Sequence, residues 1–296
     1  MNTRFLYWVG SKKRLVKRVR ELLPPQWYPD VHTYHEPFLG SGALLLALEP
    51  ARAHVGDMNR ELVNTWRRVQ EDPEYVADAV ALLLANHSKE YYYEQRARFN
   101  TMAVYGFKAL DPTMIWWTQA ARFLYLNAKC FNGLWRVNKK GEMNSPIHMD
   151  HEKRAPKREV IMAVGEYLRT NDVNVHHQDF RDATARIRAG DLLVADPPYV
   201  PASVTGDFTM YTVAGFDGAR DQIAVATMCR IASGRGARCI AFNTDCPFIR
   251  GLYSGFRFVP VELANVVSAK TTKRGKRKEL IILNYDEQGD ILEGAK

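Results

Sequence analysis

Short β-rich runs recur along this chain, and most are followed by turn residues or by apolar residues at helical spacing. The predicted strands are Val31–Glu36, Ala53–Gly56, Val173–His177, Asp191–Ala195, Arg238–Phe242 and Glu279–Leu283. The predicted helices are Leu15–Leu23, Gly42–Leu48, Leu62–Gln70 and Asp221–Ala232. Because parallel strands need crossover connections, strands that alternate with helices predict an α/β fold with a mostly parallel, doubly wound sheet.

The alternation stops between about Leu62 and Lys157. That stretch has a helical pattern rich in aromatic and amide side chains, and it ends in a polar segment from Asn127 to Pro146. A helical module inserted between the second and third strands explains the stretch better than a continuing sheet does.

The composition allows a full core, since 46% of the 296 residues are hydrophobic and 25% are charged. This length suits one large α/β domain with a smaller insert. No apolar run reaches bilayer-spanning length and no signal peptide opens the sequence, so we expect no membrane partner. The four cysteines are scattered without zinc-site spacing, so we expect reduced thiols, no metal and a cytoplasmic location.

The net charge of +8 permits an anionic partner, although a solvated basic surface explains such a charge about equally well. Its distribution is more informative. Six of the ten residues from Ser11 to Arg20 are basic, as are six of the eleven from Ser268 to Lys278. These clusters form one binding face only if the fold brings the two ends of the chain together.

A glycine-containing turn, Glu36-Pro37-Phe38-Leu39-Gly40-Ser41-Gly42, directly follows the first predicted strand. Glycines at a strand-to-helix turn let the backbone approach a ligand closely, although a plain structural turn is commoner. About twenty residues later Asp57 ends the next strand, where an acid accepts hydrogen bonds from ribose hydroxyls in nucleotide-type sites. A helix cap for Arg60 onward is the alternative interpretation of Asp57.

The sharpest motif is Asp196-Pro197-Pro198-Tyr199, which follows the predicted strand Asp191–Ala195. Two prolines stiffen the backbone and remove two amide donors, which leaves a rigid rim of acceptors beside an aromatic ring. Such a rim suits an exocyclic amine on a planar base. Accepting both N–H hydrogens, at Asp196 and at the Pro197 carbonyl, favours a pyramidal nitrogen whose lone pair is free to attack.

An amine held in this way could attack an electrophilic methyl group carried by a sulfonium. Aligning the two groups supplies much of the remaining acceleration, so this chemistry needs neither a metal nor a covalent intermediate. A base inside a duplex cannot reach such a rim. We therefore expect base flipping, with Tyr199 as the stacking partner of the flipped base.

The ordered motifs resemble the Dam-like adenine-N6 DNA methyltransferases, the D12 class or α-group. The similarity begins at Trp8-Val9-Gly10-Ser11-Lys12, continues through the glycine turn and Gly56-Asp57-Met58-Asn59, and reaches Asp196-Pro197-Pro198-Tyr199. The stretch Arg122–Asn127 through Phe131–Arg136 and Gly141–Pro146 is similar to the family's base-reading hairpin, and Phe208–Tyr211 is a smaller echo. The match runs from about Phe5 to Asp286.

The resemblance implies S-adenosylmethionine as cofactor and double-stranded DNA as partner. It implies a catalytic rim of Asp196, Pro197, Pro198 and Tyr199. It implies cofactor contacts from Trp8, Lys12, Pro37, Phe38, Gly40, Gly42, Asp57, Met58, Asp179, Phe180 and Asp196. Met58 and Phe180 would sandwich the cofactor adenine, and Asp179 would lie near its amino edge. It implies DNA contacts from Phe131, Asn132, Arg136 and Pro146, with the basic tail contributing Lys273 and Arg274.

These implications divide the chain into a Rossmann-like catalytic domain, residues 1–61 and 158–296, and a mainly helical target-recognition domain, residues 62–157. The expected activity is methylation of a flipped adenine in duplex DNA, within the nucleoid of a bacterial or phage-infected cell. A cognate restriction enzyme is compatible with this activity and is not required. Two alternatives stay open: an amino methyltransferase acting on cytosine-N4 or RNA adenine, and a catalytically silent DNA-binding relative.

Overall fold

The centre of the molecule is a seven-stranded sheet with the strand order β3-β2-β1-β4-β5-β7-β6. The computed structural model describes residues 5–105, 112–148, 156–199, 216, 218–264 and 276–296. The strands are β1 (Tyr34–Glu36), β2 (Arg52–Asp57), β3 (Asp172–His177), β4 (Leu192–Ala195), β5 (Arg238–Thr244), β6 (Arg257–Ala264) and β7 (Lys276–Leu283). The pairs from β3 to β5 are parallel, whereas β7 runs antiparallel between β5 and β6. The predicted mostly parallel sheet is confirmed.

Two predicted elements differ from the structure, and one strand of the structure was not predicted. The first strand begins at Tyr34 because the chain turns before it, with the amides of Val31 and His32 both donating to the Tyr28 carbonyl. The helix expected from Gly42 is only Leu45–Leu48 (α2), since Gly42 has a φ of +60°. Strand β6 was not predicted, because it contains Pro260. A proline is tolerated there because β6 lies at the sheet edge.

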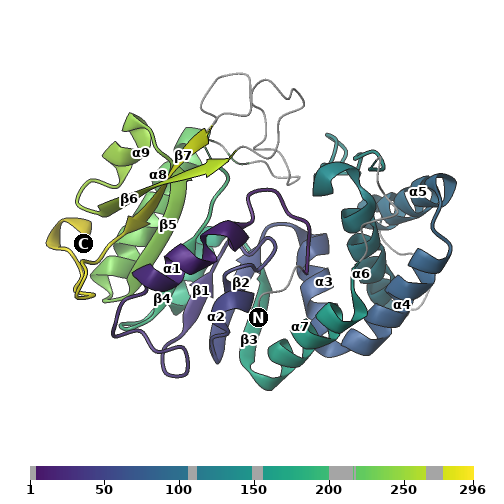
Figure 1. Cartoon of the computed structure of the whole chain (residues 1–296), viewed down its shortest axis with the longest axis horizontal. Helices are drawn as coiled ribbons and strands as arrows, with labels where there is room; N and C mark the ends of the chain where they lie inside the picture. Colours follow the sequence, from purple (N-terminus) through teal and green to yellow (C-terminus); the bar gives the residue numbers. More distant parts are fainter. Residues whose placement is uncertain (1–4, 106–111, 149–155, 200–215, 217, 265–275) are drawn as a thin grey trace.

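The helices follow two patterns. Before the first strand lie η1 (Lys12–Leu15) and α1 (Val16–Leu22). Between strands lie α2, η4 (Phe180–Arg186), α8 (Gly218–Gly234) and α9 (Pro247–Leu252), and η6 (Glu293–Ala295) follows the last strand. The chain also makes α3 (Arg60–Glu71), α4 (Pro73–Ala85), α5 (Lys89–Tyr105), α6 (Pro112–Lys129), η2 (Phe131–Gly133) and α7 (Arg158–Thr170) between β2 and β3. Figure 1 shows α4, α5 and α6 on the side away from β5, with α3 and α7 nearer the sheet. No described helix is long and apolar enough to cross a bilayer.

Both faces of the sheet are covered. In β4, Leu192 and Val194 pack into a cluster with residues of α1 and α3, whereas Leu193 and Ala195 pack into a second cluster with residues of α8 and α9. All four side chains are fully buried. Burial on both faces explains why this strand is a continuous apolar run in the sequence.

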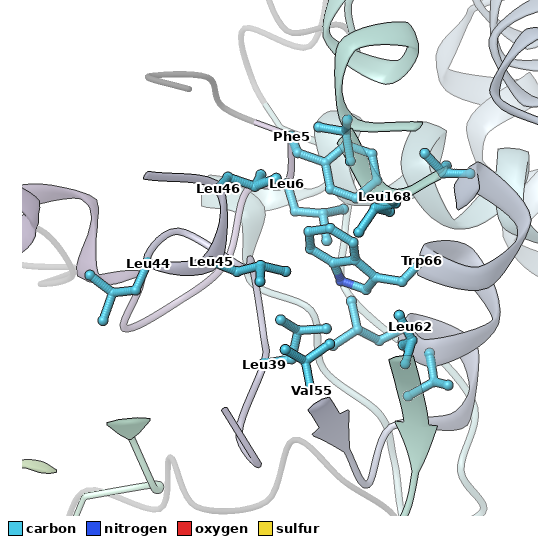
Figure 2. Close-up of a cluster of buried hydrophobic side chains, with 14 of the residues drawn as sticks. Phe5, Leu6, Leu39, Leu44, Leu45, Leu46, Val55, Leu62, Trp66 and Leu168 are labelled. Atoms are coloured by element: carbon cyan, nitrogen blue, oxygen red, sulfur yellow. The ribbon is translucent and has the colours of Figure 1, made fainter. Parts of the chain in front are cut away.

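Trp66 joins helix α3 to the glycine turn. Its indole is fully buried, lies 4.7 Å from the Phe5 ring between centroids, and is surrounded by aliphatic side chains in Figure 2. Its Nε1 donates to the Gly40 carbonyl at 3.3 Å. A Cβ on Gly42 would lie 2.5 Å from the indole carbon Cη2. The second glycine of the turn is therefore required by packing as well as by its positive φ.

Three histidines line up across β1, β2 and β3. The ring of His54 lies 5.6 Å from that of His35 and 5.4 Å from that of His176, and its Nδ1 is 3.2 Å from His176 Nε2. Burial lowers the pKa of His176 to about 4, and the charges of Arg186, His54 and Arg67 act in the same direction. Burial also lowers the pKa of His54, so a proton on His54 or His176 is disfavoured in the folded chain.

We expect Gly42→Ala to destabilise the fold by about 1–3 kcal/mol, because the added methyl overpacks against Trp66 and the residue must keep a positive φ. Chemical denaturation with urea measures the loss. Gly251→Ala is the matched control, because a Cβ there meets nothing within 4 Å and the residue lies inside α9. Equal stabilities for the two variants would contradict the packing interpretation.

We also expect the contribution of His176 to stability to fall as the pH falls from about 6.5 to about 4, while the raised pKa of Glu36 acts in the opposite direction. In that window the unfolded chain binds a proton at His176 that the folded chain does not, so protonation favours unfolding. His176→Gln should reduce the difference in unfolding free energy between pH 7 and pH 5. The same difference in wild type and variant would show that His176 carries none of it.

Candidate active site

Three acids end three adjacent parallel strands. Glu36 is the last residue of β1, Asp57 is the last of β2, and Asp196 directly follows β4. The strand order reverses between β1 and β4, since the chain builds outward from β1 to β2 on one side and from β4 to β5 on the other. Ligands of open α/β sheets bind at the carboxyl ends of the strands at such a reversal. The topology therefore places the glycine turn and the Asp196–Tyr199 tetrapeptide at the expected site.

Lys12 and Asp196 form a buried ion pair at this edge. Lys12 Nζ lies 2.7 Å from Asp196 Oδ2 and 2.6 Å from Oδ1, and it also donates to the Gly10 carbonyl at 2.9 Å. The Lys12 side chain is 6% exposed and that of Asp196 is 19% exposed. Lys12 thus lies at the centre of the site rather than on the basic surface formed by its neighbours in the sequence.

A pocket opens beside this ion pair. It is lined by Trp8, Val9, Gly10, Ser11, Lys12, Glu36, Phe38, Leu39, Gly40, Ser41, Ala43, Leu44, Asp57 and Asp196. A Cβ on Gly40 would lie 2.9 Å from the Trp8 ring, so only glycine lets the turn lie against the indole. Within the described residues, no three histidine, cysteine, aspartate or glutamate side chains gather in an arrangement that could hold a metal ion.

Asp57 fastens the glycine turn to the start of α3. One carboxylate oxygen accepts from the amide of Gly40 at 3.0 Å and the other from the amide of Asn59 at 2.9 Å. Burial raises the pKa of Asp57, and these backbone hydrogen bonds oppose the rise. The helix cap is Asn59, whose side chain accepts from the amides of Glu61 and Leu62. The interpretation of Asp57 as the cap is therefore wrong.

Glu36 is a pocket residue for which the sequence predicted no role, although it stands in the glycine-turn motif. It is buried and accepts from the Tyr34 hydroxyl at 2.9 Å. Burial raises the pKa of Glu36 to about 8 against the effect of that hydrogen bond, and the charge of Asp196 raises it further. Near neutral pH one of these two acids is therefore protonated while the other pairs with Lys12.

The rest of the tetrapeptide is also held in place. Pro197 is buried, and the Pro198 carbonyl accepts from Gln222 Nε2 at 2.7 Å. The Tyr199 hydroxyl donates to Oε2 of the buried Glu279 at 3.0 Å, and Lys12 Nζ lies 4.9 Å from the Tyr199 ring centroid. Gln222 and Glu279 carried no signal in the sequence, because they lie in α8 and β7, far from the tetrapeptide along the chain.

The predicted cofactor residues divide into two groups. Trp8, Lys12, Phe38, Gly40, Asp57 and Asp196 line the pocket, whereas Pro37, Gly42, Met58, Asp179 and Phe180 are not part of its lining. Phe180 is 4% exposed, and its ring lies 5.0 Å from that of Phe38. Met58 is 38% exposed. Asp179 accepts from the Arg181 backbone amide and pairs with its guanidinium.

The polar segment after α6 forms a hairpin. Its two sides meet at isolated antiparallel bridges, Cys130 with Ile147 and Val137 with Met143, and the amide of Gly141 donates to the Asn138 carbonyl in the turn. Trp135 anchors the hairpin, with its ring 4.2 Å from that of Phe123 in α6.

The predicted DNA-contacting residues of the hairpin are exposed. Phe131, Asn132, Arg136 and Pro146 all lie on its surface. Asn132 has a φ of +54°, which asparagine tolerates better than most residues do. His148, for which the sequence predicted no role, lies beside this end, with its Nε2 3.1 Å from Asn132 Oδ1. Lys273 and Arg274, together with most of the second basic cluster and the Phe208–Tyr211 motif, lie outside the described residues.

The start of the chain packs against this hairpin. The Tyr7 amide donates to Asn127 Oδ1 at 2.9 Å, and Asn127 Nδ2 donates back to the Tyr7 carbonyl at 2.7 Å. A Cβ on Gly133 would lie 2.6 Å from that of Tyr7. The segment that supplies Trp8 and Lys12 to the pocket is thus attached to the hairpin.

Comparisons with known proteins identify the family of this chain. Residues 8–267 match the family model of the D12 class N6 adenine-specific DNA methyltransferases. A Type II methyltransferase, M1.LlaDCHI of Lactococcus lactis subsp. cremoris, is 32% identical over 95% of this chain and 95% of its own. Type II methyltransferase M.MjaIII of Methanocaldococcus jannaschii is 30% identical over 95% of this chain and 98% of its own. A DNA adenine methylase of Vibrio cholerae is 30% identical over 94% and 95%. The chain belongs to the D12 class of N6 adenine-specific DNA methyltransferases.

Proposed function

We propose that this protein transfers a methyl group from S-adenosylmethionine to N6 of an adenine flipped out of duplex DNA. Membership of the adenine-N6 class gives the reaction. The observation that carries the assignment to particular residues is the Lys12–Asp196 ion pair, which lies beside the pocket that Asp57 and the glycine turn enclose.

The pocket fits such a cofactor. This cofactor is a cationic amino acid joined to a nucleoside. Its positive charges and ribose hydroxyls need carboxylates, its other polar groups need backbone atoms within hydrogen-bonding distance, and its apolar parts need an aromatic ring to pack against. The pocket offers Asp57, the Gly40 backbone and Trp8 for these needs. Asp57 retains acceptor capacity beyond its two backbone hydrogen bonds, since an ionised carboxylate can accept about four. When bound, S-adenosylmethionine supplies an electrophilic methyl group on a sulfonium.

Phe38, Phe180 and Met58 are proposed to hold the adenine end of the cofactor. Phe38 lines the pocket and packs on Phe180, so together the two rings extend the apolar surface outward from it. Met58 directly follows Asp57 and is exposed, which suits a flexible side chain that would cover a ligand. Asp179, next to Phe180, is proposed to lie near the amino edge of the adenine.

Asp196 is the proposed acceptor for one hydrogen of the target amine. Lys12 holds both carboxylate oxygens, which fixes their direction and keeps the group ionised. The Pro197 carbonyl is the proposed second acceptor. Two acceptors fixed in advance stabilise the pyramidal amine of the transition state more than the planar amine of the ground state.

Tyr199 is the proposed stacking partner of the flipped base. Its hydroxyl bond to Glu279 restrains rotation of the ring, and Lys12 lies near the ring. A restrained ring beside the rim places a stacked adenine with its amine at Asp196, which supplies the alignment that in-line methyl transfer requires.

Residues 62–157 are the proposed target-recognition region. The hairpin exposes a planar guanidinium, a carboxamide and an aromatic ring at Arg136, Asn132 and Phe131. The first two side-chain types pair naturally with guanine and adenine edges, and the third can wedge between bases. Tyr7 contacts Gly133 of the hairpin and is hydrogen-bonded to Asn127 near the end of α6, so the proposed base-reading region adjoins the segment that supplies Lys12.

Asp196→Ala tests the catalytic assignment. We expect kcat to fall by about 100- to 1,000-fold, because one positioned acceptor of the transition state is lost. The measurement incubates duplex DNA with S-adenosylmethionine and quantifies N6-methyladenine by mass spectrometry of the digested DNA. N4-methylcytosine in the wild-type product would favour the cytosine alternative, and no product at all would favour a silent relative.

The matched control is Asp172→Ala. Asp172 is exposed and is the first residue of β3, at the edge of the sheet opposite the pocket, so its removal should leave kcat unchanged. Circular dichroism and cofactor titration check that Asp196→Ala is folded and still binds. A folded variant with wild-type turnover would overturn the role of Asp196.

Arg136→Ala tests base reading. Among the described residues its exposed guanidinium has no hydrogen-bond partner, so it is available for two parallel bonds to guanine O6 and N7. Losing such a pair should cost about 1–3 kcal/mol of discrimination at one G·C base pair. The measurement compares kcat/KM on duplexes that each carry one substituted base pair near the target adenine.

Lys140→Ala, in the turn of the same hairpin, is the control and should keep the wild-type order of the duplexes. Arg136→Ala should flatten the preference at one position while cofactor affinity is unchanged. Equal losses on every duplex would show that Arg136 contacts phosphate or supports the loop.

A further inference from the structure

Two fully buried amides lie beneath the catalytic tetrapeptide. Gln222 in α8 donates from Nε2 to the Pro198 carbonyl at 2.7 Å. Asn243 in β5 donates from Nδ2 to Gln222 Oε1 at 2.7 Å. Asn243 Oδ1 in turn accepts the backbone amide of Thr244 at 2.9 Å. A chain of hydrogen bonds therefore runs from the end of β5 through α8 to the rim.

The direction of this chain is fixed at both ends. The Thr244 amide can only donate, so it selects the oxygen of Asn243 and turns the Asn243 nitrogen toward Gln222. The Pro198 carbonyl can only accept, so it selects the nitrogen of Gln222. Both ends require the same orientation of the two amides. Neither amide can flip without leaving a buried polar group unpaired.

The surroundings make these amides unusual. Residues close to these amides in the same two elements are apolar and buried. Val225 and Ala226 of α8 and Ala241 of β5 all belong to the hydrophobic cluster between α8 and the sheet. Burying an amide costs free energy unless its hydrogen bonds are made, and an apolar side chain would avoid that cost. Packing alone therefore does not account for two polar residues here, whereas fixing a carbonyl of the tetrapeptide does.

We propose that Gln222 and Asn243 are positioning residues that hold the Asp196–Tyr199 rim in the geometry required for methyl transfer. This inference rests on the proposed function. The rim is then held at three places: Asp196 by Lys12, Pro198 by Gln222, and Tyr199 by Glu279. The prolines lack amide hydrogens, so the backbone of the rim cannot be fixed by its own donors at those two positions. A donor from outside has to supply the restraint.

Holding the Pro198 carbonyl also sets the peptide plane between Pro198 and Tyr199. That plane fixes the positions of the Tyr199 N and Cα atoms and therefore the point from which its side chain extends. The Tyr199 ring is the proposed stacking surface for the target base. A misplacement of about 1 Å at a reacting centre costs roughly 100-fold in rate. Gln222 and Asn243 should therefore affect the chemical step while leaving cofactor and DNA affinity unchanged.

The test uses Gln222→Glu and Asn243→Asp, which keep the shape of each side chain. A protonated acid still donates a hydrogen bond to its acceptor, whereas the carboxylate cannot. We measure single-turnover methyl transfer from pH 5.5 to 9 and divide each rate by the wild-type rate at the same pH. This division removes the titration of Glu36, which both proteins share.

We expect the ratio to fall by about 100-fold as the introduced acid ionises and to recover at low pH. A residue that only filled space would give a ratio independent of pH. Asn284→Asp is the matched control, because the fully buried Asn284 Nδ2 also donates to a backbone carbonyl, that of Ala237, beside the end of β5 opposite the rim. Its ratio should stay near one at every pH.

A double variant, Gln222→Met with Asn243→Leu, covers the case in which the acidic variants do not fold. It replaces both amides with apolar groups of similar size, so neither side chain is left unpaired, and the Pro198 carbonyl and the Thr244 amide each lose one partner at a cost of about 1–3 kcal/mol. We expect it to fold, to bind cofactor and DNA as wild type does, and to transfer methyl slowly at every pH. Wild-type single-turnover rates in this variant, or a flat ratio in folded acidic variants, would overturn the inference. An inactive wild type would instead refute the proposed function.

Discussion

The ion pair between Lys12 and Asp196 is the contact on which the site depends. It joins residues 184 positions apart in the sequence and closes the start of the chain over the carboxyl ends of β1 and β4. A buried ammonium is strongly disfavoured without a partner, so removing either residue would leave an unpaired charge in the core of the site. The pair therefore holds the N-terminal segment in place and directs the carboxylate at the same time.

The charge balance around this pair extends to Glu36. Two acids and one lysine share a largely buried space, and the raised pKa of Glu36 leaves a single carboxylate opposite the ammonium near neutral pH. Asp57 is supported differently, by two backbone amides. The three acids at the edge of the sheet are therefore stabilised in three ways: Glu36 by protonation, Asp196 by Lys12 and Asp57 by two backbone amides.

The same N-terminal segment connects the pocket to the hairpin that is proposed to read DNA. Tyr7 is fixed to Asn127 by two hydrogen bonds, and Gly133 leaves no room between the hairpin and the Tyr7 backbone. One residue later Trp8 lies against Gly40 of the pocket. If the hairpin moved on binding DNA, the movement could therefore reach the pocket through the contacts of Gly133 with Tyr7 and of Trp8 with Gly40.

Much of this protein could be predicted from the sequence, because some signals are local. The apolar run that ends at Asp196-Pro197-Pro198-Tyr199 predicts a buried strand followed by the tetrapeptide, and the glycine turn with Asp57 predicts the turn that lines the pocket. The exposed hairpin also follows from a local motif. Other features depend on contacts between distant residues. Val31 lies outside β1 because its amide takes part in a local turn. Strand β6 was not predicted because it contains Pro260, and it pairs only with β7 at the edge of the sheet. By charge alone Lys12 is one of six clustered cations, and the family resemblance implies that it contacts the cofactor. Only the fold shows that it is buried against Asp196. Gln222, Asn243 and Glu279 become relevant only where α8, β5 and β7 converge on the rim, because hydrogen bonds between elements leave no periodic trace in the sequence.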